Sequence, residues 1–220
     1  MKYLSWNQKT IDDYSFANIN AQYEKGYVMT RISKGLMSET RSLRVPIKDF
    51  KLSSENRRIL NKIQNIKLAT IDLPHPDYHF SIGKVAKDFY ENRFGPNIMS
   101  AQKVKEMLTD ISKSNFNTLL TYSRDNTVLG YAIALKTDKI LHYSYPFYDL
   151  KSPKDMGLCM MLNAIIYAKE LGLEYVYLGS LQRKSDSYKL QFSHIEWWDN
   201  KEWSSDINSV KEILKNIDNE

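Results

Sequence analysis

The stretch between residues 117 and 179 constrains the fold more than any other part of the chain. Its apolar residues alternate in three segments, then recur at helical spacing, and finally form a short continuous run. The predicted elements are strands at residues 117–123, 127–136 and 139–145, a helix at 155–171 and a buried strand at 174–179. Asp125 and Asn126 supply the turn of the first hairpin, and Gly172 ends the helix. This order of elements indicates an α/β fold with a mixed, mostly antiparallel central sheet flanked by helices.

The rest of the chain predicts further elements in the same alternating manner. The predicted helices are residues 10–25 and 207–217, a basic helix that begins at Ser53 or Ser54, and two amphipathic helices that carry Ile82, Val85 and Phe89 and then Val104, Met107, Leu108 and Ile111. The predicted strands are residues 27–32, 41–47, 66–71 and 192–197. Thr10 and Asp13 resemble the start of a capping box, and Ser100 precedes the second amphipathic helix. We expect a module of residues 1–72 to pack on a catalytic domain of residues 73–220, the two forming one compact unit.

The charge of the chain fits a nucleic-acid partner without demanding one. The formal net charge is +5, and a basic balance favours contact with phosphates. Cys159 is the only cysteine, which excludes a disulfide within the chain and a metal site built from cysteines. The first residues lack the apolar run of a signal peptide, and no stretch approaches the ~18 apolar residues that span a membrane. We therefore expect a soluble, cytoplasmic protein.

Two histidines lie four residues apart in the segment that follows the strand at residues 66–71. His75 and His79 would form a metal pair only on a helix, but Pro74 and Pro76 oppose a helix there. We therefore predict a loop with solvated or structural histidines, and no metal site.

The most specific pattern lies near the end of the second half. Residues 174–179 read Glu-Tyr-Val-Tyr-Leu-Gly, residues 188–192 read Tyr-Lys-Leu-Gln-Phe, and Glu196 follows. This pattern resembles the Tyr-Leu-Gly … Tyr-Lys-x-x-Phe-x-x-x-Glu signature of the arginyl- and leucyl-tRNA–protein transferases. The resemblance implies an acyltransferase fold like that of the N-acetyltransferases, in which a ligand enters where central strands splay.

Two further segments match the same family in the same order. Phe147-Tyr148-Asp149 followed by Gly157 resembles the family's Phe-Tyr-Asp … Gly segment. Residues 43–47, with Phe50 and then Ser53 to Arg58, resemble its Leu-Arg-Ile … Phe … Ser-x-x-Arg-Arg stretch. The resemblance therefore covers residues 20–203, and three ordered segments are more specific than one motif.

The chain departs from the family pattern at three places. Met37 and Thr40 stand where the family often has the two cysteines of a Cys-x-x-Cys motif. Residues 26–29 read Gly-Tyr-Val-Met where the family has Gly-Trp-Arg-Arg, and Ser180-Leu181 replaces an aromatic Tyr-Trp pair. We expect a preserved scaffold with altered recognition of the acceptor.

The resemblance implies transfer of an amino acid from an aminoacyl-tRNA ester to an amine. Converting an ester to an amide is downhill, so the reaction requires neither ATP nor a metal, and we predict no cofactor other than aminoacyl-tRNA as co-substrate. The predicted acceptor is a protein or peptide N-terminus. The enzyme must align the amine with the carbonyl and stabilise the oxyanion.

The predicted catalytic residues lie at the ends of two strands. Tyr148 and Asp149 end one strand, where the carboxylate can orient or deprotonate the amine, or else only begin the helix that follows. On the strand at residues 174–179, Tyr177 can donate a hydrogen bond to the ester oxygen, and Gly179 lets a substrate backbone approach. Packing within the strand is the competing interpretation of Tyr177 and Gly179.

The predicted substrate-binding residues are basic or aromatic. They are Arg44, Arg57, Arg58, Arg183, Lys184, Tyr188 and Lys189. Lys189 can meet the phosphate of the terminal adenosine or an acceptor carboxylate, and Arg183 with Lys184 can follow tRNA phosphates. Arg57 and Arg58 can hold an acidic acceptor or the acceptor stem, although arginines on exposed helices are common. Arg44 interrupts an apolar strand and therefore needs a partner.

Three other functions stay open. A coenzyme A-dependent N-acyltransferase is disfavoured, because the pyrophosphate needs a glycine-rich loop and residues 152–157 contain one glycine and one proline. A non-catalytic tRNA- or peptide-binding relative would fit the missing arginines and cysteines. The same chemistry on a specialised peptide or small-molecule amine would fit the changed acceptor residues. The transferred amino acid does not follow from the sequence.

Overall fold

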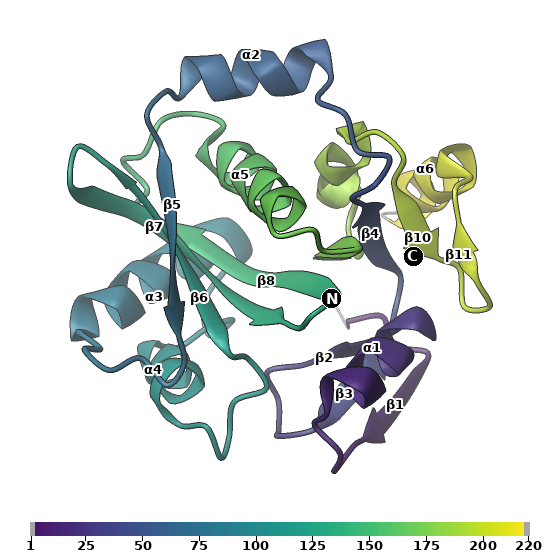
Figure 1. The fold of residues 1–220 in the computed structure, drawn as a ribbon, viewed down its shortest axis with the longest axis horizontal. Helices are drawn as coiled ribbons and strands as arrows, with labels where there is room; N and C mark the ends of the chain where they lie inside the picture. The colour runs from purple at the N-terminus through teal and green to yellow at the C-terminus, as the bar shows by residue number, and fades with distance from the viewer. Residues whose placement is uncertain (1–2, 218–220) are drawn as a thin grey trace.

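The structure, a computed structural model, describes residues 3–217 as two β-sheets with helices packed around them (Figure 1). The elements of the first part are β1 (Asn7–Thr10), α1 (Phe16–Glu24), β2 (Tyr27–Met29), β3 (Leu36–Glu39), β4 (Ser42–Pro46), α2 (Ser54–Lys62) and β5 (Lys67–Asp72). Those of the second part are α3 (Phe80–Phe94), α4 (Ala101–Thr109), β6 (Thr118–Arg124), β7 (Thr127–Lys136), β8 (Ile140–Tyr148), α5 (Met156–Glu170), β9 (Tyr175–Ser180), the 3₁₀ helix η1 (Lys184–Gln191), β10 (Glu196–Trp198), β11 (Trp203–Ser204) and α6 (Ile207–Asn216).

The larger sheet has the strand order β11-β10-β4-β9-β8-β7-β6-β5, and the smaller one has the order β1-β3-β2. Among the strands that the structure describes in residues 3–217, only β8 and β9 pair in parallel, and α5 makes the crossover that a parallel pair requires. The predicted α/β architecture with a mixed, mostly antiparallel sheet is therefore confirmed. Because β4 and β5 belong to the same sheet as the later strands, one sheet runs across residue 72. The division into 1–72 and 73–220 stays a prediction.

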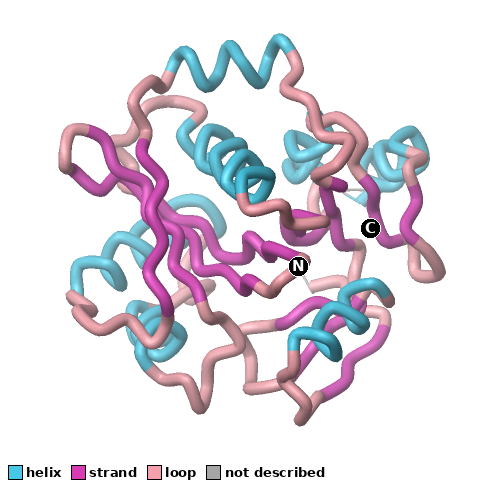
Figure 2. Tube along the Cα trace, in the orientation of Figure 1, coloured by secondary structure: helices cyan, strands magenta, loops and turns pink. Residues whose placement is uncertain are grey.

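Helices cover both faces of the larger sheet (Figures 1 and 2). Along β9, Val176 and Leu178 join the core under α5 and α2, whereas Tyr177 joins the core that includes α1, α3 and α4. This alternation follows from the two-residue period of a strand. Helix α5 is apolar on nearly all sides because it lies between α2 and the sheet.

Several local predictions are confirmed because the residues that cap or turn the chain act locally. Ser53 caps α2 in a capping box with Asn56, and Ser100 caps α4. Asp125 and Asn126 take φ angles of 49° and 62°, as a tight hairpin turn between β6 and β7 requires.

Other local predictions differ from the structure. Thr10 ends β1 instead of starting a helix, and Ser15 caps α1, because residues 7–10 pair with β3. The strand β3 itself was not predicted, and the last predicted strand is shortened to β10. Ile111 lies beyond the end of α4 and is 67% exposed instead of joining the core.

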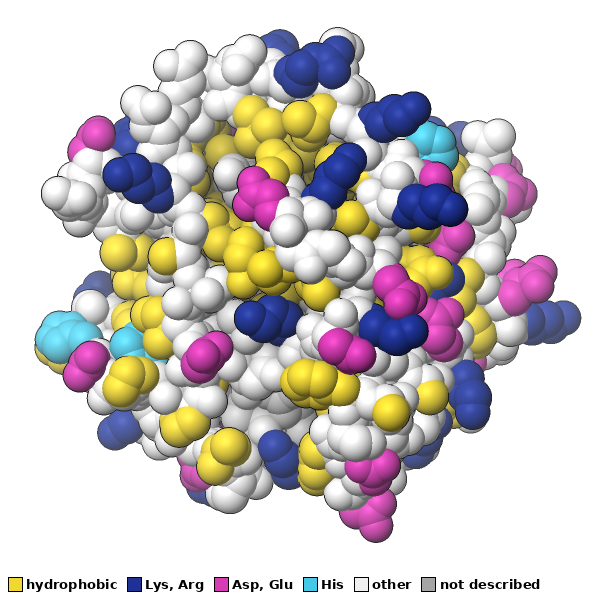
Figure 3. Space-filling view, in the orientation of Figure 1, with side chains coloured by type: hydrophobic (Ala, Val, Ile, Leu, Met, Phe, Trp, Pro, Cys, Tyr) yellow, Lys and Arg dark blue, Asp and Glu magenta, His cyan; other side chains and the backbone are white. Residues whose placement is uncertain are grey.

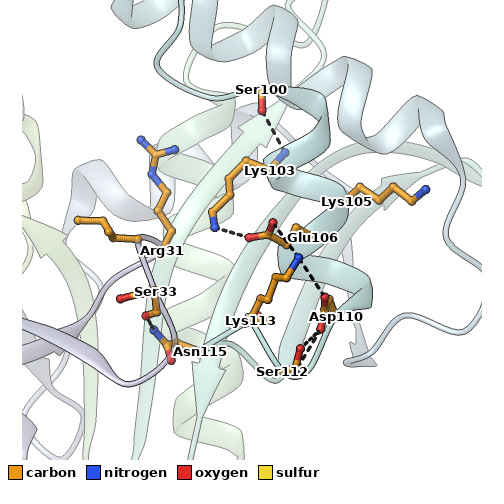
Figure 4. Close-up of polar contacts among 12 residues, drawn as sticks. Arg31, Ser33, Ser100, Lys103, Lys105, Glu106, Asp110, Ser112, Lys113 and Asn115 are labelled. Carbon is orange, nitrogen blue, oxygen red and sulfur yellow. Dashed lines mark hydrogen bonds and ion pairs between the residues drawn. The ribbon is translucent and has the colours of Figure 1, made fainter. Parts of the chain in front are cut away.

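The small sheet is fastened to the rest of the protein by Asn115, which lies just before β6. Its side-chain oxygen accepts from the N–H of Gly35 at 2.7 Å, and its amide nitrogen donates to the carbonyls of Thr30 and Ser33 at 2.7 and 2.8 Å. Figure 4 shows Asn115 reaching the segment of Ser33 in this way. One buried side chain thus satisfies three backbone groups of the loop between β2 and β3.

Arg44 on β4 forms the central ionic cluster of the fold. Its side chain is 6% exposed, its Nε lies 2.7 Å from Glu196 Oε2, and its Nη1 lies 3.0 Å from Glu24 Oε2. The guanidinium also lies 4.0 Å from the ring centroid of Tyr175 and 4.1 Å from that of Trp203. The expectation that a charge in this strand needs partners is confirmed, and the cluster joins α1, β4, β9 and β10.

Replacing Arg44 tests how much this cluster contributes to the free energy of unfolding. The substitution Arg44→Met leaves the partly buried Glu196 without its cation, so we expect a loss of about 3 kcal/mol in the free energy of unfolding, the lower end for a buried pair because Glu24 is half exposed. Urea unfolding measures the loss. Arg58→Met is the control, because its pair with Glu55 is exposed and contributes at most about 1 kcal/mol. Equal losses in both variants would contradict the assignment.

Candidate active site

The pairing of β8 and β9 stops halfway along both strands. Ile140, Leu141 and His142 pair with residues 175–177, but β8 continues to Tyr148 and β9 to Ser180. At the same level, β8 shifts its register against β7, and β9 shifts its register against β4. The central strands therefore separate, as the resemblance implied. We call the space between residues 143–148 and residues 178–180 the strand gap.

Gly179 accounts for the divergence of β9. Its φ of +77° lies in the left-handed region, which side-chain-bearing residues adopt only with strain. It stands between the pairs Tyr177–Arg44 and Ser180–Ser42, where the register shifts. A bulge with a left-handed glycine bends a strand and ends its regular pairing.

Lys189 of η1 lies at the strand gap. Its Nζ donates to the carbonyl of Ser180 at 3.1 Å and lies 3.7 Å from Asp186 Oδ1. A Cβ at Gly179 would be 3.7 Å from the same Nζ. Gly179 and Lys189 are therefore neighbours, and the ammonium lies where β9 no longer pairs with β8.

Tyr177 does not reach the strand gap, which corrects the prediction that it donates to the ester. Its side chain is fully buried, and its hydroxyl lies 3.3 Å from Arg44 Nη1. Its ring packs edge-on against Tyr23, with centroids 4.8 Å apart. Burial raises the pKa of Tyr177. The residue supports the floor beneath the gap and holds Arg44. The role of Arg44 in substrate binding stays a prediction, since its described partners are protein groups.

Tyr148 lies at the end of β8 and meets a residue that the sequence did not single out. Its hydroxyl accepts from Arg93 Nη2 at 3.0 Å, and its ring centroid lies 4.7 Å from that of Phe89. A Cβ at Gly157 would lie 3.3 Å from the Tyr148 ring, so glycine there lets the ring pack on the start of α5. Arg93 was not predicted, because a single arginine in the last turn of an amphipathic helix does not form a recognisable motif.

Tyr188 joins these residues from η1. About half of its side chain is exposed. Burial of its hydroxyl and the nearby Asp186 carboxylate raise the pKa of Tyr188, while Arg93 opposes the rise. Tyr188, Tyr148 and Arg93 therefore border one region of mixed aromatic and cationic character.

The other predicted site residues lie in more ordinary surroundings. Asp149 is exposed, and its Oδ1 accepts from the N–H of Lys151 at 2.8 Å, as in a turn. The Arg183 guanidinium lies 4.8 Å from the ring centroid of Phe94, and Lys184 is exposed. On α2, Arg57 donates to the carbonyl of Leu52 and Arg58 pairs with Glu55. Their proposed roles stay predictions.

His142 is a buried group that the sequence did not indicate. Tyr23 Oη accepts from the N–H of Met29 at 3.1 Å and shares a hydrogen bond of 2.7 Å with His142 Nδ1. Burial and the positive charge of Lys189 lower the pKa of His142 to about 3. The imidazole is therefore neutral at physiological pH and lies close enough to Lys189 to sense its charge.

A cavity lies elsewhere in the fold. It measures about 170 Å³ and lies between α1 and α4, with Phe16, Met29, Met107 and Phe116 in its wall. None of the predicted site residues lines it. It is smaller than a typical ligand pocket of about 300 Å³ or more. Its position does not support the predicted chemistry.

Basic side chains do not gather into one patch on the face in view. Figure 3 shows lysines and arginines interspersed with acidic groups and apolar surface. Figure 4 shows the same mixture at α4, where Lys103 and Lys113 pair with Glu106, and Lys113 also pairs with Asp110. Within residues 3–217, no group of three or more His, Cys, Asp or Glu side chains is placed to hold a metal ion. Nor is any helix of that range long and apolar enough to cross a membrane.

Comparison with known proteins places these features in a family context. Residues 80–199 match the family model described as arginine-tRNA-protein transferase, C terminus. An aspartate/glutamate leucyltransferase of Ruegeria sp. (strain TM1040) is 29% identical over 185 residues, covering 80% of this chain and 66% of the relative. One of Acinetobacter baumannii (strain ATCC 17978) is 26% identical over 163 residues, covering 70% of this chain and 58% of the relative. The chain thus spans about 58% to 66% of the length of these two relatives.

Solved structures resemble the chain more distantly. The structure of L-PGS from Bacillus licheniformis has a TM-score of 0.49 and 12% sequence identity, and the match covers 91% of this chain and 62% of that one.

The titration of His142 tests whether Lys189 lies at the strand gap. We expect the imidazole to stay neutral down to about pH 3, and Lys189→Met to raise its pKa because a nearby positive charge is removed. NMR titration of the ring protons measures both. Lys184→Met, which removes an exposed lysine of the same 3₁₀ helix, should leave the pKa unchanged. A His142 pKa near the ordinary ~6.5 would contradict the geometry.

Proposed function

The chain belongs to the arginine-tRNA-protein transferase family, and on this premise we propose that it transfers an amino acid from an aminoacyl-tRNA to the N-terminal amine of a protein or peptide. The family match covers more than half of the chain and includes β8, β9 and η1. The observation that carries the proposal is the strand gap, where β9 bends at Gly179, Lys189 binds the carbonyl of Ser180, and Tyr148 ends the facing strand β8.

We propose leucine as the transferred amino acid and an N-terminal Asp or Glu as the acceptor. The names of the relatives motivate both choices. The charges at the gap support them, because Arg93 and Lys189 would attract an acceptor carboxylate and repel a cationic aminoacyl side chain. Val28 and Met29, which stand where the family has arginines, are buried and apolar, so other cations must recognise the acid here.

In the proposed reaction, the acceptor nitrogen attacks the carbonyl carbon of the aminoacyl ester. A C–N bond forms, the C–O bond to the ribose breaks, and the proton lost by the nitrogen passes to the ribose oxygen. An α-amine has a pKa near ~8, so a usable fraction is neutral at physiological pH without a strong base. Positioning and electrostatic stabilisation therefore provide most of the rate enhancement.

The residues of the strand gap can divide this work between them. In this proposal the Lys189 ammonium stabilises negative charge on the carbonyl oxygen, and its low exposure of 12% and its bond to Ser180 support that role. The Tyr148 hydroxyl accepts from Arg93 and can donate its own proton in a hydrogen bond to the ribose oxygen. Asp149, next to Tyr148, is the candidate to orient the amine.

Mass spectrometry of acceptor peptides tests the proposal. Peptides that begin with Asp, Glu, Ala or Lys are incubated with the protein and either leucyl-tRNA or arginyl-tRNA. We expect a leucyl residue on the Asp and Glu peptides, because the cations at the gap favour an acidic acceptor. Transfer to the neutral peptides alone would replace the proposed acceptor by a specialised amine. Failure of transfer to every peptide would overturn the function.

Two glycine variants connect that activity to the strand gap. Gly179→Ala and Gly172→Ala both place a side chain at a left-handed φ, of +77° and +70°, so each should lose about 1 kcal/mol of unfolding free energy. Only Gly179→Ala should also lower the transfer rate, by about tenfold or more, because the bend that opens β9 is disturbed. Equal rates for the two variants would remove Gly179 from the site.

A further inference from the structure

The segment that precedes β1 reaches the strand gap. Trp6 donates its N–H to the carbonyl of Glu39 at 2.9 Å and so extends the pairing of β1 with β3. Before Trp6, the chain passes the end of β3 and meets Ser180 and Gln182, which lie far away in the sequence. We call residues Tyr3–Ser5 the strap. In Figures 1 and 2 the chain before β1 runs toward the middle of the view, beside the larger sheet.

Two side chains bind the backbone of Leu4 as the edge of a β-strand would. The Leu4 N–H donates to Gln182 Oε1 at 2.7 Å, and the Leu4 carbonyl accepts from Thr40 Oγ1 at 2.7 Å. Gln182 Nε2 donates to Thr40 Oγ1 at 2.8 Å, so the two side chains hold each other in place. The backbone N–H of Gln182 is in turn fixed by Asp186 Oδ2 at 2.9 Å. Gln182 and Thr40 therefore bind the main chain of Leu4 through hydrogen bonds that do not depend on its side chain.

The first residue of the strap lies against the candidate active site. Tyr3 Oη is 2.5 Å from Ser180 Oγ, and the carbonyl of the same Ser180 accepts from Lys189. On the other side of the gap, Tyr3 is close enough to Tyr145 of β8 to contribute, after burial, to the raised pKa of Tyr145. The Tyr3 residue is nevertheless 56% exposed. The strap therefore lies beside the ends of both separated strands, and Tyr3 is not buried in the core.

We propose that Gln182 and Thr40 form a subsite for the main chain of the acceptor polypeptide, and that the strap occupies this subsite as an internal competitor. The inference rests on the proposed function, since it names where the acceptor lies. An enzyme that modifies many N-termini must bind chains of varied sequence. Hydrogen bonds to the main chain provide affinity without selecting for particular side chains. A polypeptide bound as Leu4 is bound would pass beside Ser180, the neighbour of Gly179.

The strap competes with the acceptor peptide because its own concentration at the subsite is high. A segment tethered this closely has an effective concentration on the order of millimolar, so even weak contacts compete with a free peptide. Releasing the strap should therefore tighten the binding of an acceptor peptide. A purely structural arm would behave differently, since its loss would lower stability and leave peptide binding unchanged or weaker.

The test uses full-length variants and a peptide that begins with Asp and carries fluorescein at its C-terminus. Leu4→Pro removes the N–H that Gln182 binds, whereas Leu4→Ala keeps it and is the matched control. Fluorescence anisotropy should show the peptide binding about tenfold more tightly to Leu4→Pro than to the unchanged protein or to Leu4→Ala, as expected for one lost hydrogen bond of about 1.4 kcal/mol. A gain in binding cannot arise from misfolding.

A second substitution assigns the gain to the subsite. Adding Gln182→Ala to Leu4→Pro should abolish the tighter binding, because the peptide loses the acceptor of its N–H. Tighter binding that survives Gln182→Ala, or Leu4→Pro that binds no better than Leu4→Ala, would overturn the proposal. Absence of peptide binding in every variant would overturn it as well.

Transfer kinetics separate this proposal from the function on which it rests. In Leu4→Pro, the KM for the peptide should fall, while the KM for aminoacyl-tRNA and kcat stay unchanged. If transfer occurs but the KM for the peptide is unchanged by Leu4→Pro and by Gln182→Ala, the subsite is rejected and the function is retained. The predicted binding pattern without transfer from any charged tRNA would reject the function and retain the subsite.

Discussion

The bend of β9 at Gly179 is the constraint from which the candidate active site follows. Parallel strands normally continue their ladder, but the left-handed glycine ends the pairing with β8 after Tyr177. The backbone that is left without a partner strand is met by side chains, with Lys189 donating to the carbonyl of Ser180. Tyr148 and Arg93 border the other strand. The two separated strands therefore have polar side chains beside them, Lys189 at β9 and Arg93 at the end of β8.

The layer beneath the gap keeps this opening in shape. Arg44 joins Glu24, Glu196 and the hydroxyl of Tyr177, so that three strands and α1 meet at one buried charge. A buried guanidinium needs its partners, and that requirement fixes where those elements lie. Neutral His142 fills the adjoining position. The ionic cluster therefore belongs to the framework, while the cations that face the gap come from α3 and η1.

Much of the fold could be predicted from the sequence because its signals are local. The Asp125-Asn126 turn, the Ser53 and Ser100 caps and the apolar period of α5 each act within a few residues. The strand conformation of Thr10 could not be predicted, since it depends on pairing with β3. At the site, Gly179 and Lys189 were found through a motif. Arg93 and Gln182 were not predicted, because the role of each depends on contacts with residues that are distant in the sequence. Tyr177 was assigned to the gap because a strand pattern does not tell which face is open.

The central claim is that the acyl group is transferred in the gap between β8 and β9. A crystal structure with a stable analogue of the donor, a leucyl group joined by an amide to the 3′ position of adenosine, tests it most directly. We expect the leucyl carbonyl to lie between Tyr148 and Gly179, within hydrogen-bonding reach of Lys189. Binding of the leucyl group in the cavity between α1 and α4, with the strand gap empty, would rule out transfer between β8 and β9.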